Sequence, residues 1–104
     1  MPHRYAKEKL SRIVYALATR EGDVRDRLKA AYRDIRILTP EDVPPGMQSD
    51  LQEVKDWLVR YGPERYRGQL VQSALEHTLR RSRNGTARRI AEKLYAMNRR
   101  IRSR

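Results

Sequence analysis

The residues best able to do chemistry lie in the last quarter of the chain, residues 80–104. This stretch holds ten Lys or Arg against one acid, Glu92, and so contributes +9 of the formal charge of +11. Guanidinium groups match phosphate oxygens in a two-pronged geometry, and a one-sided positive field attracts polyanions. The composition of this stretch therefore predicts contacts with phosphate groups.

A second basic row lies on residues 24–37. Its bases recur at i, i+4, i+8 and i+11, which places them within about 80° of a helix surface, away from the apolar face. Arg outnumbers Lys by 19 to 5, which suits phosphate contacts, although a GC-rich genome would produce the same bias. From the two stretches we predict these nucleic-acid-binding residues: Arg25, Lys29, Arg33, Arg36, Arg80, Arg81, Arg83, Arg88, Arg89, Lys93 and Arg100.

The middle of the chain is acidic. Residues 39–64 hold two bases and six acids, a net charge of 2 − 6 = −4. Asp50, Glu53 and Asp56 share one face of an expected helix. We interpret this face as solvated. The alternative is that it recognises a basic partner, or the basic last helix of a second copy.

Groups suited to catalysis or metal binding are sparse. His77 has no acid four residues further on, His3 lies near the N-terminus, and the chain has no Cys. We therefore interpret His77 as a histidine at the margin of a core, because metal and catalytic sites need several convergent partners. Glu41 and Asp42 are adjacent in a loop and are not expected to converge. The isolated glycines form no phosphate-binding loop. We therefore expect that the protein is not an enzyme and binds no cofactor or metal.

Length and composition predict one domain. A chain of 104 residues with 38% hydrophobic residues can form one core but not two ordinary ones. The longest apolar run, residues 13–18, is shorter than a secretory signal or a membrane span requires. We therefore expect a cytoplasmic protein with no membrane partner.

Apolar residues at helical spacing predict an all-α fold, a single compact domain of about five helices spanning residues 1–104. The helices are expected at 4–20, 24–37, 47 or 49 to 61, 64–81, and from 86 onward. Their connections are short except for one longer Pro-rich loop at 39–46. No alternating strand pattern is visible. The predicted core contains Leu10, Leu28, Leu51, Val54, Leu58, Leu75, Ile90 and Leu94.

Turn residues set the expected helix boundaries. Gly22 can adopt the left-handed conformation that closes a helix, and Asp23 can cap the next one. Thr39 can cap a single turn that begins with a proline. Asn84–Gly85 is expected to separate the last two helices, and Thr86 is expected to cap the last one. The short first connection makes the first two helices neighbours.

Two segments partly match the helix-turn-helix pattern. In the segment that begins at Thr86, Tyr95 occupies the position of the turn glycine, so one continuous helix is expected. In residues 17–28, Glu21 and Asp23 occupy positions that the motif fills with apolar residues. Specific base readout is therefore not predicted.

Two functions of different classes follow. The first is association with nucleic acid, non-specific or of unknown sequence, mainly through phosphate contacts. The alternative is a protein-interaction or assembly module, which would bind an acidic protein or form a homodimer through its acidic third and basic fifth helices. Trp57 or Tyr61 would then supply an anchor. A domain whose basic surface is only solvated is the third interpretation.

Overall fold

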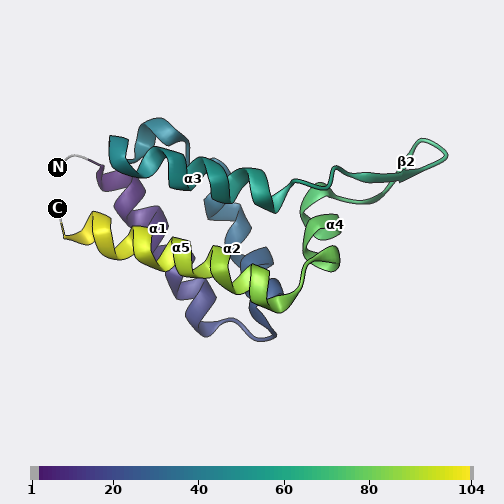
Figure 1. Ribbon diagram of the computed structural model, residues 1–104, viewed down its shortest axis with the longest axis horizontal. Coiled ribbons are helices and arrows are strands. Elements are labelled where there is room, and N and C mark those ends of the chain that lie inside the picture. Colours follow the sequence, from purple (N-terminus) through teal and green to yellow (C-terminus); the bar gives the residue numbers. More distant parts are fainter. Residues whose placement is uncertain (1–2, 104) are drawn as a thin grey trace.

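The first two helices of the chain pack against each other and against the last helix. The computed structural model describes residues 3–103, leaving out the side chains of residues 66 and 71. Its elements are α1 (Arg4–Thr19), α2 (Val24–Ile37), the 3-10 turn η1 (Pro40–Asp42), α3 (Pro45–Leu58), β1 (Glu64–Tyr66), β2 (Gln69–Gln72), α4 (Ala74–Arg81) and α5 (Asn84–Arg102) (Figure 1). The predicted all-α class is confirmed.

The turn between α1 and α2 follows from two residues. Gly22 has a φ of 95°, which places it in the left-handed region that favours glycine. Asp23 caps α2: its Oδ1 accepts from the N–H groups of Arg25 at 2.9 Å and Asp26 at 3.2 Å. The Asp26 carboxylate accepts in return from the Asp23 N–H at 3.1 Å. The predicted cap of α2 is confirmed. Gly22 is left-handed as expected, but it does not close α1, which ends at Thr19 with Arg20 in an extended conformation.

One hydrophobic core joins all the α-helices in the described residues. α5 packs against α1, α2 and α3, which explains why its apolar line is buried. The predicted core residues that are buried are Leu10, Leu28, Leu51, Val54, Leu58, Ile90 and Leu94. Leu75 is only partly buried, because it lies in the first turn of a shorter helix than expected.

The Pro-rich segment is more structured than a loop. η1 follows Thr39, whose N–H donates to the Asp42 carboxylate at 2.8 Å, and Val43 is buried. α3 then begins at Pro45, since proline suits the first position of a helix. It ends at Leu58 rather than at Tyr61, ahead of the Gly62–Pro63 break. The predicted bounds of this helix were therefore wrong at both ends.

The expected helix over 64–81 was wrong in its first half. β1 and β2 form an antiparallel hairpin in which Arg65 pairs with Leu70 and Tyr66 with Gln69. Its tip consists of Arg67 and Gly68, with φ values of 51° and 81°. Two consecutive left-handed residues are what a two-residue hairpin turn requires. Gly68, which weakens a helix, is here the residue that makes the turn possible.

The first residues of α4 and α5 also differ from the predicted ones. Ser73 caps α4 by accepting from the Glu76 N–H at 3.1 Å, and the Glu76 carboxylate accepts from the Ser73 N–H at 3.2 Å. This capping-box pattern was present in the sequence and was overlooked. α5 begins at Asn84, so the predicted break there and the cap at Thr86 were wrong. The expected single continuous helix is confirmed.

The hairpin projects from one end of the helical body (Figure 1). It accounts for much of the elongation, with principal extents of 49 × 27 × 18 Å. Its residues 64, 65 and 67–70 are exposed.

We expect Leu58→Ala to lower the free energy of unfolding by about 2–5 kcal/mol, because it empties a fully buried site. The neighbouring Val59, 37% exposed, supplies the control. Val59→Ala should cost about 0.5 kcal/mol or less. Urea denaturation measures both, and a Leu58 cost as small as that of Val59 would contradict the packing.

Two glycine substitutions should act in opposite directions. At Gly22 a Cβ would lie 2.4 Å from Asp26 Oδ2 and the backbone is left-handed, so Gly22→Ala should cost at least about 1 kcal/mol. Gly85 lies in the first turn of α5, where an added Cβ would meet open space beyond the helix's own backbone. Gly85→Ala should stabilise by up to about 1 kcal/mol. Thermal melts of both variants test this; a stabilised Gly22→Ala variant would be incompatible with the turn.

Candidate nucleic-acid interface

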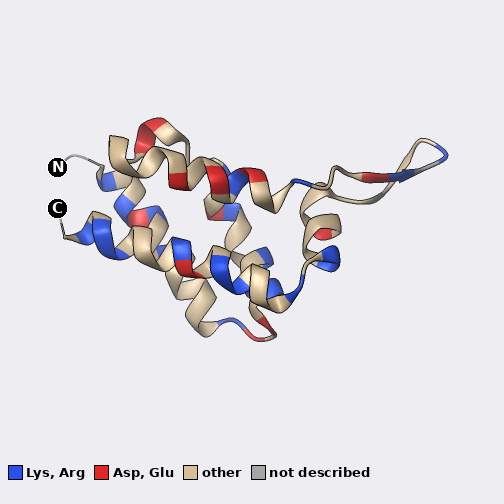
Figure 2. Cartoon of the chain, viewed as in Figure 1, with Lys and Arg blue, Asp and Glu red and all other residues tan. Residues whose placement is uncertain are grey.

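The acids of α3 and the bases of α5 pair within the chain. Lys93 Nζ lies 3.1 Å from Glu53 Oε2 and 3.8 Å from Asp50 Oδ1. Arg100 Nη1 lies 3.4 Å from Asp50 Oδ2. Figure 2 shows acids along α3 and bases along α5. Glu53 and Asp56 are exposed and Asp50 is half-buried, and two of these three acids, Asp50 and Glu53, have partners on the chain's own last helix. These contacts span 40 and 50 residues, so helical periodicity could not reveal them.

The basic row of α2 is also partly engaged. Arg25 Nη2 lies 2.9 Å from Asp23 Oδ2, and Arg25 Nη1 donates to the Ser82 carbonyl at 3.2 Å. Arg25 thereby ties the start of α2 to the turn between α4 and α5. Lys29 Nζ lies 3.4 Å from Glu76 Oε2. Arg33 and Arg36 are exposed further along the helix.

Two carboxylates are held in their charged form by these contacts. Hydrogen bonds from the Arg25 guanidinium, and then from the Asp26 N–H, lower the pKa of Asp23. Hydrogen bonds from Ser73, with a smaller effect of Lys29, lower the pKa of Glu76. Both acids therefore remain charged at neutral pH and offset nearby positive charge.

The remaining predicted residues gather where α4 ends and α5 begins. We call this set, Arg80, Arg81, Arg83, Arg88 and Arg89, the arginine corner. All are exposed, and no acid occurs in the sequence between Glu76 and Glu92. Figure 2 shows bases at both ends of this junction. The Arg81 guanidinium lies 4.6 Å from the centre of the Tyr61 ring, which fixes it over an aromatic face.

The N-terminus of α5 adds to the positive field of the corner. Arg83 occupies its cap position without a capping hydrogen bond from the side chain, and the first turn holds no acid. The first N–H groups of a helix lack partners within the helix and carry partial positive charge. The corner therefore combines guanidinium groups with backbone donors, both of which bind phosphate oxygens.

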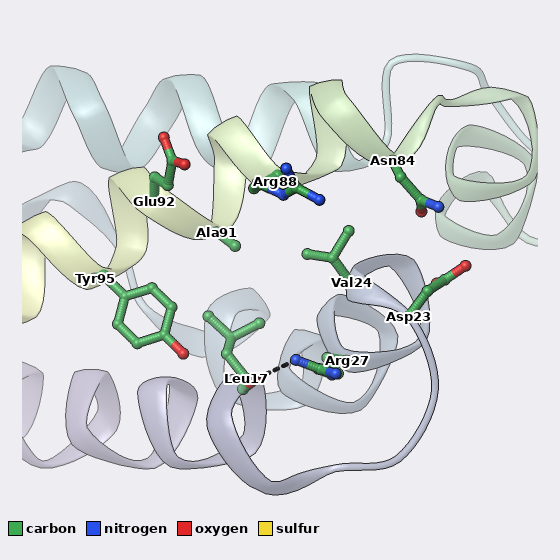
Figure 3. A pocket seen from close by; sticks show the side chains of 9 residues that line it. All are labelled: Leu17, Asp23, Val24, Arg27, Asn84, Arg88, Ala91, Glu92 and Tyr95. Atoms are coloured by element: carbon green, nitrogen blue, oxygen red, sulfur yellow. Dashed lines mark hydrogen bonds between the residues drawn. The ribbon is translucent and has the colours of Figure 1, made fainter.

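A cleft of about 340 Å³ opens between α5 and the turn that joins α1 to α2 (Figure 3). Its charged lining residues are Asp23, Arg27, Arg88 and Glu92. Arg27 is committed to the turn, since it donates to the carbonyls of Gly22 at 3.0 Å and Leu17 at 3.5 Å. Two bases and two acids leave the cleft without net charge, so it does not extend the field of the corner.

Bases of α1, which were not among the predicted residues, also contribute to the positive surface. Lys9, Arg12 and Arg20 line a groove between α1 and α2 together with Arg33. They recur at i, i+3 and i+11 beside the apolar line of α1, and that spacing could have identified them.

His77 supports the base of the hairpin. Its Nδ1 lies 2.8 Å from the Gly62 carbonyl oxygen, and because a carbonyl only accepts, Nδ1 must carry the proton. Nε2 lies 3.7 Å from Glu64 Oε2. This geometry fits the interpretation of His77 as a margin residue with a hydrogen-bonded nitrogen.

Within residues 3–103, no three His, Asp or Glu residues are grouped so that they could hold a metal ion. In the same part of the chain, no helix combines the length and the apolar character needed to cross a membrane. Comparison of the chain with protein-family models, with curated proteins and with solved structures found no match.

We expect the α3–α5 ion pairs to contribute little to stability, and only at low salt. Asp50→Asn combined with Glu53→Gln should lower the free energy of unfolding by about 1 kcal/mol or less for each ion pair lost, because the partners are largely solvent-accessible. In about 1 M salt, where charges beyond about 3 Å are screened, the cost should nearly vanish. Asp56→Asn is the control, since Asp56 accepts a hydrogen bond from Gln52 on its own helix and forms no ion pair with α5 in the described residues. A cost that persists in high salt would mean that these side chains act through packing.

Proposed function

We propose that this protein binds nucleic acid mainly through phosphate contacts, without catalysing a reaction, and that the arginine corner is its principal contact surface. The observation that carries the proposal is the exposure of five arginines around an uncapped helix N-terminus, in a stretch without acids. Duplex DNA carries one negative charge per about 1.7 Å of axis. A cluster of this kind therefore meets several phosphates at once.

Internal pairing divides the predicted residues into two groups. Lys93 and Arg100 face the acids of α3, and Arg25 and Lys29 face Asp23 and Glu76. A base that already has a carboxylate partner gains less from a phosphate, because the first partner must be displaced. We therefore expect the arginine corner to contribute more than these four residues. Phosphate contacts carry no sequence information, so we expect little sequence preference.

The alternative, assembly of copies through α3 and α5, has less support. The charges that would join two copies pair inside one chain, so an assembly would have to exchange these contacts for equivalent ones. An acidic protein would instead meet the arginine corner and compete with nucleic acid there. A cytoplasmic location remains a prediction.

We expect replacement of Arg80, Arg83, Arg88 and Arg89 with Gln to weaken binding to duplex DNA and to flatten its salt dependence. Each lost phosphate contact lowers the slope of log affinity against log salt by about 0.9, so the full set should lower it by up to about 3.6. Fluorescence anisotropy between about 50 and 200 mM salt measures the slope. Gln retains helix propensity, and circular dichroism should remain unchanged.

The matched control is Lys93→Gln with Arg100→Gln, which removes bases that the chain itself pairs. This variant should change the slope by less than about half a unit for each residue. An equal loss in both variants would contradict the special role of the corner. Absence of binding by the wild-type protein at about 50 mM salt, where non-specific attraction is strong, would refute the proposed function.

A further inference from the structure

The groove between α1 and α2 is a further concentration of positive charge in the described residues. It has a volume of about 420 Å³, and its charged and aromatic lining comes from Lys9, Arg12, Tyr15, Arg20, Arg33 and Asp34. The short turn at Gly22 brings the two helices together, so bases from both face the same space. Four bases and one acid give the groove a net charge of +3.

Most of this charge is not offset by strong ion pairs. Lys9 Nζ lies 3.8 Å from Asp34 Oδ1, which offsets the one acid of the groove. Arg12 lies 3.4 Å from Glu8, but both side chains are more than half exposed, so the pair is weak. For Arg20 and Arg33 no ion pair is recorded within residues 3–103. The groove therefore presents guanidinium groups to an incoming anion.

An exposed aromatic ring lies among these bases. Tyr15 is 70% exposed, more than any other large apolar side chain in the described residues. Phosphate binding alone does not require an aromatic group. An aromatic ring beside guanidinium groups allows an unpaired base to stack on the ring while the guanidinium groups neutralise the phosphates of the strand. In a duplex, the faces of the bases are already covered by their neighbours, so the ring favours a single strand.

We propose that the α1–α2 groove binds a segment of single-stranded nucleic acid, with its phosphates against Arg12, Arg20 and Arg33 and one base stacked on Tyr15. This inference rests on the proposed function and deepens it. It adds a second contact surface, and it names single strands as the preferred form.

Anisotropy titrations with three probes test the groove: an unstructured single strand of about 12 nucleotides, a duplex of the same length, and inorganic polyphosphate of similar charge. Tyr15→Leu keeps an apolar side chain but removes the ring. It should weaken single-strand binding about 5- to 100-fold and leave polyphosphate binding unchanged. Arg20→Gln with Arg33→Gln should weaken binding of both the single strand and polyphosphate.

Tyr95→Leu is the matched control, because Tyr95 is also exposed, at 39%, but lines the cleft beside α5. It should leave single-strand affinity within about twofold.

Unchanged single-strand affinity in Tyr15→Leu, or an equal loss of polyphosphate binding, would overturn the stacking. If the groove variants bind like wild type and the arginine-corner variant does not, this inference fails alone. If wild type binds neither nucleic-acid probe, the proposed function fails with it.

Discussion

The burial of one face of α5 is the constraint on which the rest of the structure depends. Leu94, Met97 and Ile101 are essentially inaccessible to solvent, and the helix contacts α1, α2 and α3. Because side chains on a helix have fixed directions, docking this face also determines where the bases of α5 lie. Lys93 and Arg100 are turned toward α3. Arg88 and Arg89 remain at the exposed start of the helix.

Local signals allowed much of the fold to be predicted. Gly22 and Asp23 specify the first turn by their own conformational and capping preferences, and the apolar spacing of α1 and α2 fixes their buried faces. The hairpin was not predicted because its sequence carries no clear local signal. Leu70 and its neighbours carry no alternating pattern, and the conformation depends on Arg67 adopting a positive φ beside Gly68. Such a conformation is uncommon for a residue other than glycine.

The candidate site was less predictable than the fold because it depends on long-range pairing. Sequence spacing correctly placed the bases outside the apolar faces. It could not show that Asp50 and Glu53 lie opposite α5, since these acids and their partners are about 40 to 50 residues apart. It also treated each helix alone, whereas the α1–α2 groove takes its charge from two. Internal pairing thus engages part of the basic surface, at Arg25, Lys29, Lys93 and Arg100, and leaves the arginine corner exposed.

The hairpin formed by β1 and β2 has a practical consequence for studying the protein. Its tip, Arg67–Gly68, is exposed and lies at the far end of a segment that projects from the helical body (Figure 1). Exposed loop tips away from a core tolerate insertions well. A fluorophore or short tag placed there would therefore report on the orientation of the domain on a bound ligand. It would do so without touching the core, the arginine corner or the α1–α2 groove.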